Sequence, residues 1–178
     1  MFDDSDMKIV SDRPSESVKN YTTNHSDDLT ANEVKAAKEL GLIIAEKFLS
    51  ESNAITAPDG DDSQMLLQRK LLLSFTISVS LDEFCRNDSI SGIAEKSFLD
   101  KVKSISHELY LSCCDTGAFS FYYLAYRRKD DVERRIGQTF AMLCSHDGDP
   151  IFQELGETLY CWFSSVVKAA TENLNLQK

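Results

Sequence analysis

The fold of this chain is decided by residues 109–163, which read LYLSCCDTGAFSFYYLAYRRKDDVERRIGQTFAMLCSHDGDPIFQELGETLYCWF. This stretch carries 11 of the 17 aromatic residues in the 178-residue chain. Aromatic side chains bury large apolar areas, so we expect the main core to be centred here. Core packing explains such a cluster without a bound ligand, and the stretch contains no assembled catalytic set.

Composition and charge exclude several classes of function. The chain is 42% hydrophobic and 27% charged, which is typical of one globular domain. Its net charge of −10 repels phosphate backbones and anionic lipids, so we predict no nucleic-acid partner and no membrane partner. The longest apolar run, residues 71–81, is far shorter than the roughly 20 residues that a membrane span needs.

The cysteines and the first residues predict a cytoplasmic protein. The chain begins with acidic residues where a secretory signal would be basic, and no long apolar segment follows them. Five cysteines, an odd number, are scattered among apolar neighbours, a pattern typical of reduced thiols.

Residues 1–29 differ from the rest of the chain. They contain seven acidic and three basic residues and few apolar ones, which predicts a mobile acidic tail. Residues 30–178 carry helical periodicity and are predicted to form a single helical domain. Thr30 and Glu33 have the spacing of a capping box, which places the start of the first helix there.

The second helix is expected from residue 62 or 63 to about 86, after a turn at residues 57–60. Within it, Phe75, Ile77, Val79 and Leu81 alternate with Ser and Thr, a pattern that also suits a strand. A helix is favoured because no partner strand is apparent, and a lone strand leaves its backbone groups unpaired.

Four further helices are predicted. One begins at Asp88 or Ser89 and continues to about residue 114, and the next, at residues 119–126, is apolar most of the way round and is expected to be central and buried. A helix follows residue 131, with Gly137 inside it. The last begins at Asp149-Pro150, contains Gly156 and ends near residue 173.

The last helix is expected to face the core with a stripe of large apolar residues at helical spacing: Phe152, Leu155, Leu159, Trp162 and Val166. We interpret Gly137 and Gly156 as positions where helices cross closely, since glycine otherwise costs about 1 kcal/mol in a helix. The fold class predicted is therefore all-α, an irregular bundle of about six helices.

Two clusters have residue types that carry chemistry. Cys144, His146, Asp147 and Asp149 could ligate zinc, but the spacing between Cys144 and His146 is too short for a typical site, and we predict no metal and no cofactor. Residues 127–129 with Arg134 and Arg135 form the densest basic cluster. It is interpreted as a solvated turn between helices, with an acidic or phosphate-bearing partner as the alternative.

The leading functional hypothesis is a non-enzymatic protein that binds a protein partner or itself, because its apolar helix faces exceed what one simple bundle buries. A homodimer is one form of this hypothesis. The alternative is a small-molecule-binding protein or enzyme with a pocket among the aromatic helices, and its expected lining is Tyr122, Tyr123, Tyr126, Trp162 and His146.

Overall fold

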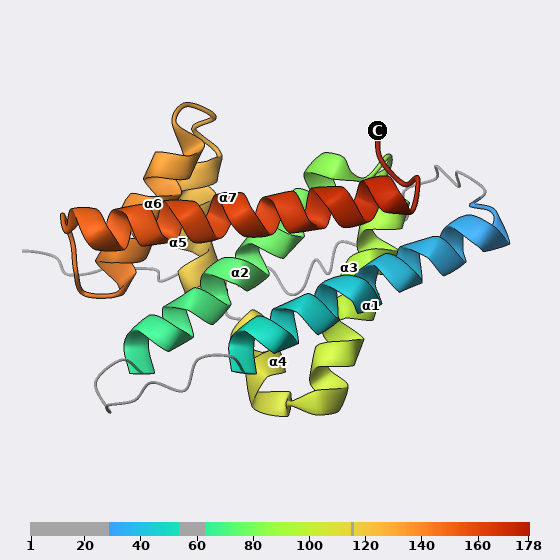
Figure 1. The fold of residues 1–178 in the computed structure, drawn as a ribbon, viewed down its shortest axis with the longest axis horizontal. Helices are drawn as coiled ribbons and strands as arrows, with labels where there is room; N and C mark the ends of the chain where they lie inside the picture. Colours follow the sequence, from blue (N-terminus) through green and yellow to red (C-terminus); the bar gives the residue numbers. More distant parts are fainter. Residues whose placement is uncertain (1–28, 54–62, 115) are drawn as a thin grey trace, which may run out of the picture.

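The computed structural model describes residues 29–53, 63–114 and 116–178, and these residues form seven α-helices (Figure 1). The helices are α1 (Ala31–Asn53), α2 (Ser63–Phe84), α3 (Asp88–Ile105), α4 (His107–Cys113), α5 (Thr116–Tyr126), α6 (Val132–Leu143) and α7 (Pro150–Asn173). The all-α prediction is confirmed. The predicted tail, apart from Leu29, and the predicted turn at residues 57–60 lie outside the described residues.

The helices pack as two groups joined by α2 and α7. Helix α1 packs mainly against α3, and α6 packs mainly against α7. Helix α2 passes beneath α7, as Figure 1 shows, and contacts helices of both groups. Within the described ranges, no helix is both long and apolar enough to traverse a lipid bilayer.

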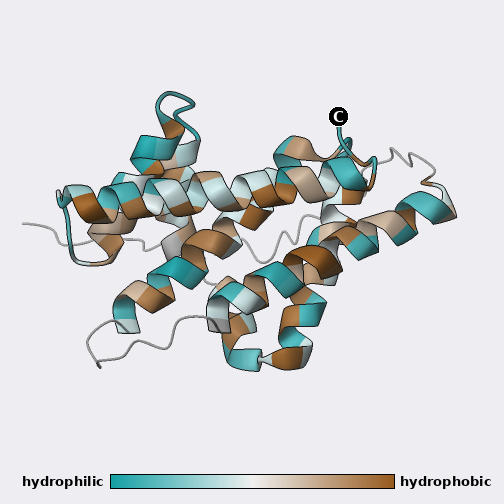
Figure 2. Ribbon diagram, in the orientation of Figure 1, coloured by the Kyte–Doolittle hydropathy of each residue, from teal (hydrophilic) through white to brown (hydrophobic). Residues whose placement is uncertain are grey.

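Helix α2 is buried on two opposite sides, which explains its alternating sequence. Ile77 and Leu81 face the cluster formed with α1 and α3, whereas Phe75 and Val79 face the cluster formed with α5 and α6. Each pair is four residues apart, so it lies on one side of the helix, and the two pairs are offset by two residues, about 200°. The prediction of a helix is confirmed, and Figure 2 shows the hydrophobic residues along its middle.

The expectation that residues 109–163 hold the main core is wrong. The larger hydrophobic cluster is formed by α1, α2, α3 and α4 with the C-terminal half of α7, and Phe48 and Phe98 meet in it with ring centroids 5.4 Å apart. The aromatic stretch supplies most of a smaller cluster, in which Phe75 stacks on Tyr122. Aliphatic residues and alanines at helix crossings fill the larger cluster, so aromatic density did not locate it.

The predicted helix from Asp88 or Ser89 is interrupted once, and for this reason the structure has seven helices where about six were expected. Ser106 has an extended backbone (φ −146°, ψ 111°), and its hydroxyl accepts a hydrogen bond from the Leu109 backbone N–H. It therefore ends α3 and caps α4. Asn87, rather than Asp88 or Ser89, caps α3.

The prediction that the helix at 119–126 is central and buried is also wrong. Helix α5 contacts α6 and α2, and Tyr122 and Ala125 are buried on that side. Phe121 and Leu124 lie on the other side and are exposed to solvent, 49% and 63% respectively. Helix α2 occupies the central place, so the apolar surface that the sequence indicated on α5 has no covering helix among the described residues.

Helix α7 is rotated relative to the predicted stripe. Its buried face contains Leu159 as predicted but continues through Gly156, Phe163 and Val167, while Leu155 and Trp162 point outward. The predicted role of Gly156 as a position of close helix crossing explains why α7 turns this face toward the core. A Cβ on Gly156 would lie 2.6 Å from the Phe140 Cβ, so α6 approaches α7 on the glycine side.

Candidate functional site

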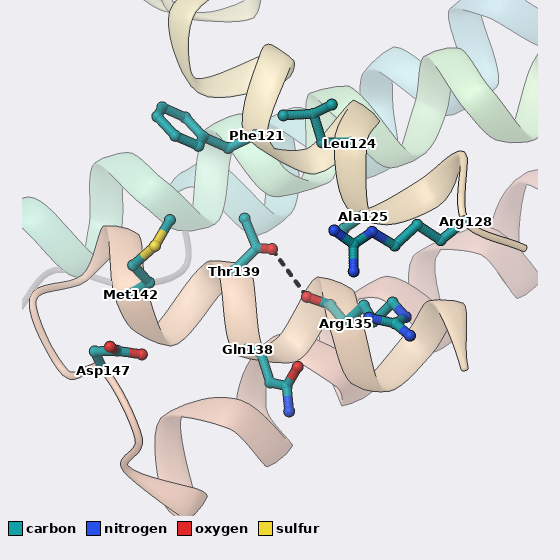
Figure 3. Close-up of a pocket in the computed structure, with 9 residues that line it drawn as sticks. All are labelled: Phe121, Leu124, Ala125, Arg128, Arg135, Gln138, Thr139, Met142 and Asp147. Carbon is teal, nitrogen blue, oxygen red and sulfur yellow. Dashed lines mark hydrogen bonds between the residues drawn. The ribbon is translucent and has the colours of Figure 1, made fainter. Parts of the chain in front are cut away.

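A groove runs between α5 and α6 on the surface of the molecule, with a cavity volume of about 270 Å³ (Figure 3). We call it the α5–α6 groove. Its lining consists of Phe121, Leu124, Ala125, Arg128, Arg135, Gln138, Thr139, Met142 and Asp147. Phe121 and Leu124 come from α5, Met142 comes from α6, and Asp147 comes from the loop before α7.

The middle of the groove is apolar because α5 carries apolar residues on two sides and the neighbouring helices cover only one of them. Phe121 and Leu124 are three residues apart and share one side of the helix, opposite the buried Tyr122 side. Met142 is also exposed and faces them from α6. Exposed apolar side chains that gather over two helices are typical of a binding surface, whereas single ones are not.

The two ends of the groove carry opposite charge. Arg135 hydrogen-bonds Asp130 at 2.6 Å, and this bond holds the pKa of the Asp130 carboxyl below its ordinary value, so the pair stays ionised and its charges compensate. Arg128 makes no hydrogen bond to any described side chain, its charge also helps to lower the pKa of Asp130, and its guanidinium reaches between α5 and α6 (Figure 3). Asp147 lies at the other end of the groove.

A second hollow, of about 430 Å³, lies on the neighbouring side of α5. Phe119, Tyr123, Leu124 and Arg127 contribute to its lining. Leu124 therefore forms a ridge between this hollow and the α5–α6 groove, and each hollow has an exposed arginine at its edge. The outward side of α5 is thus apolar along its length and cationic where the helix ends.

The largest of these hollows, about 640 Å³, lies elsewhere, where α1 ends and α2 begins. Its rim includes Ser52 and Ser63, which lie beside the ends of the segment 54–62. That segment is outside the described residues, so this hollow does not define a complete site.

The five residues predicted to line an aromatic pocket lie in different environments. Tyr122 is buried and its hydroxyl has no hydrogen-bond partner among the described residues, whereas Tyr126 is half-buried and its hydroxyl donates to Glu83. Tyr123 lines the hollow on α5, Trp162 is exposed on α7, and His146 lies in the loop before α7. They therefore do not form one shared lining.

Three of the five thiols are buried and are placed for packing. Burial raises the pKa of Cys85, Cys113 and Cys144 to about 11, so these groups are protonated at neutral pH and are poor nucleophiles. His146 stacks on Phe152 with ring centroids 3.7 Å apart. In the parts of the chain that the structure describes, three or more His, Cys, Asp or Glu side chains do not converge as a metal site.

Sequence reasoning did not identify Phe121 and Leu124 as site residues, and it gave a partner-binding role to Arg128 only as the alternative for the basic cluster. A signal was present, because apolar residues on both sides of residues 119–126 run directly into the basic cluster at 127–129. That pattern was interpreted as burial followed by a solvated turn. Only the placement of α2 showed that one side of α5 has no helix packed against it in the described part of the chain.

Comparison of the chain with protein-family models, with curated proteins and with solved structures finds no significant match.

Proposed function

We propose that this protein acts by binding an acidic amphipathic helix of a partner protein in the α5–α6 groove. The observation that carries the proposal is the exposure of Phe121 and Leu124 beside Arg128, whose guanidinium makes no hydrogen bond to a described side chain. Apolar anchors with a charged rim are the usual composition of a protein interface. An enzymatic role has less support, since the thiols considered above are protonated and the groove is open.

The dimensions of the groove favour a helix as the bound element. Arg135 and Met142 are seven residues apart on α6, about 10 Å along the axis, or two helical turns. A partner helix with apolar residues at i, i+3 or i+4, and i+7 presents its anchors over the same length. Acidic residues at one end of that helix would meet Arg128, and Asp147 would disfavour acids at the other end.

The acidity of the whole chain makes the groove selective. With a net charge of −10, the protein repels most anionic molecules, so an acidic partner gains attraction only close to Arg127 and Arg128. This charge distribution also disfavours nucleic acid as the partner, because a polyanion would contact acidic surface beyond the groove. We place the protein in the cytoplasm, a proposal that the five free cysteines support.

The test is a titration of the full chain with a labelled 16-residue amphipathic peptide that has leucines on one face and glutamates at one end. We expect Arg128→Glu to weaken binding about tenfold, equivalent to about 1.4 kcal/mol, since attraction becomes repulsion. Leu124→Ala should weaken it by a similar factor through loss of the ridge. Binding is measured by fluorescence anisotropy at two salt concentrations.

The matched control is Arg134→Glu, which makes the same change of charge on α6 at an exposed position outside the groove lining. It should leave the affinity nearly unchanged. The proposal is contradicted if Arg134→Glu weakens binding as much as Arg128→Glu, or if a version of the peptide with lysines in place of glutamates binds equally well.

A further inference from the structure

The outward face of α7 carries a second exposed pattern, separate from the α5–α6 groove. Six exposed residues follow one another at steps of four, three, four, three and four: Ile151, Leu155, Thr158, Trp162, Ser165 and Ala169. We call these residues the α7 seam. Ile151 is 73% exposed and Trp162 is 40% exposed. Helix α7 lies across the front of the molecule in Figure 1, where no described helix covers it.

The spacing of the α7 seam is that of the contact positions in a two-helix coiled coil. The buried face of α7 is centred elsewhere, on Gly156, Phe163 and Val167, so the seam is not a continuation of core packing. Its charge content is also unusual for an exposed helix face, because none of its members is charged. The next position in the series is Glu172, which ends the seam.

We propose that the α7 seam pairs with the α7 seam of a second copy of this chain, antiparallel and about a twofold axis. The absence of charge supports this occupant. Two copies that each carry a net charge of −10 repel one another, so contact is favoured where acidic side chains are missing or face a basic one. The seam meets this condition from Ile151 to Ala169, about 27 Å of helix.

The order of side-chain sizes fits the antiparallel arrangement. With the axis beside residue 160, Ile151 faces Ala169 of the second copy, and Trp162 faces Thr158 of the second copy. By the same pairing Leu155 faces Ser165. Every bulky residue thus meets a small one, an alternation of sizes that lets facing helices interdigitate. Parallel pairing in register would instead place Trp162 against its own counterpart.

The residues along one edge of the α7 seam are complementary in the same arrangement. Glu154, Cys161 and Lys168 recur every seven residues beside the seam. Antiparallel pairing brings Glu154 near Lys168 of the second copy, and symmetry makes this contact twice. It also brings Cys161, which is exposed, near its own counterpart beside the axis. A single helix pair is smaller than a standard interface, so the dimer is expected to form at micromolar concentration.

Two properties of the chain allow a direct test on the full-length protein. Trp162 is its sole tryptophan, so its fluorescence reports on the seam alone. We expect the emission to shift to shorter wavelength as the concentration rises through the micromolar range, in step with a dimer in sedimentation equilibrium. A short bis-maleimide should link the two copies through Cys161. The link should persist in Cys114→Ser, which removes the other exposed thiol, and disappear in Cys161→Ser.

Charge variants test the antiparallel pairing of the two α7 seams, and one of them is chosen because it should not disturb the fold. Leu155→Glu should weaken association at least about tenfold. Ile151→Glu should do the same and keep the fold, since an acidic residue is favourable in the first turn of a helix. Lys168→Glu should also weaken association, and the double variant Glu154→Lys with Lys168→Glu should restore it. Ser104→Glu, an exposed change on α3, serves as the matched control and should have no effect.

A wild-type protein that stays monomeric at high micromolar concentration overturns the proposal. Cross-linking through Cys114, or failure of the double charge exchange to restore the dimer, overturns the antiparallel seam. Peptide binding in the α5–α6 groove should be unchanged in Leu155→Glu, so the two surfaces can fail independently.

Discussion

At the scale of single residues, glycines set how closely the helices approach. A Cβ on Gly137 would lie 2.3 Å from the backbone carbonyl oxygen of Gln153, and a Cβ on Gly41 would lie 2.2 Å from that of Ala94. These contacts are with backbone atoms, which cannot rotate away. Helices α6 and α7, and α1 and α3, can therefore pack this closely only because these positions lack a side chain.

We predict that Gly137→Ala destabilises the protein by about 1–3 kcal/mol, because overpacking at the crossing exceeds the gain in helix propensity of about 1 kcal/mol. The matched control is Gly92→Ala on α3, where an added Cβ meets no atom within 4 Å. That variant should be more stable by about 0.5–1 kcal/mol. Urea unfolding measures both changes, and equal effects at the two positions would refute the packing role of Gly137.

At the scale of the element, the start of α1 shows how a local motif fixes a helix end. The Glu33 carboxylate accepts hydrogen bonds from the Thr30 backbone N–H at 2.8 Å and from its hydroxyl at 2.9 Å. The Thr30 hydroxyl in turn accepts from the Glu33 backbone N–H at 3.3 Å, so the predicted capping box is confirmed. Arg86 also hydrogen-bonds the Glu33 carboxylate, which ties α1 to the residues after α2.

The capping box predicts a pH dependence. Hydrogen bonds from the Thr30 backbone and hydroxyl, assisted by Arg86, lower the pKa of Glu33 below its ordinary value of 4.5. The stabilisation that depends on the ionised carboxylate is therefore present above that value and is lost as the pH falls through the lowered pKa of the folded state. We expect the stability difference between wild type and Glu33→Gln to shrink as the pH falls below about 4.

The direct measurement is a carboxyl titration of Glu33 followed by NMR. The pKa should rise in Thr30→Ala, which removes the hydroxyl but keeps the backbone donor. It should also rise in Arg86→Ala, which removes both the guanidinium hydrogen bond and its positive charge. A larger rise in Arg86→Ala than in Thr30→Ala would show that the ion pair, and not the cap, controls the carboxylate.

At the scale of the whole molecule, α2 and α7 join two hydrophobic clusters into one body. Ile77 belongs to the larger cluster and Val79, two residues away on the same helix, belongs to the smaller one. Both helices contribute to both clusters, so neither cluster can lose its packing without disturbing these two shared helices. We therefore expect the molecule to unfold in one cooperative transition. Mutations in one cluster should nevertheless not change the effect of mutations in the other.

Because the two clusters are separate, mutations in them should have additive effects on the free energy of unfolding. Ile77→Val should cost about 0.5–1.5 kcal/mol and Val79→Ala about 1–3 kcal/mol, and the double variant should match their sum within about 0.5 kcal/mol. Phe48→Leu and Phe98→Leu supply the contrast, since these rings are in contact at 5.4 Å and their effects should deviate from the sum. Marked non-additivity between Ile77 and Val79 would show that α2 separates the clusters less than its geometry indicates.

The positions of the helices were predictable from sequence wherever the signal was local. The cap by Asp149 with Pro150 after it and the Thr30–Glu33 box both lie where predicted. Ser106 was missed because a serine among apolar residues at helical spacing is also compatible with an unbroken helix. Only the basic half of the candidate site was predictable from sequence. The basic cluster was recognised, but Leu124 beside it was assigned to the core.

By itself the sequence determined the all-α fold, most helix ends and the amount of apolar surface, because caps and periodicity act within a few residues. Only the tertiary structure decided which apolar faces are covered. Helix α2 took the central position, α5 was left with Leu124 in solvent, and Gly156 turned α7 so that Trp162 points outward. Burial depends on which neighbour a face meets, and no pattern within a single helix specifies that neighbour.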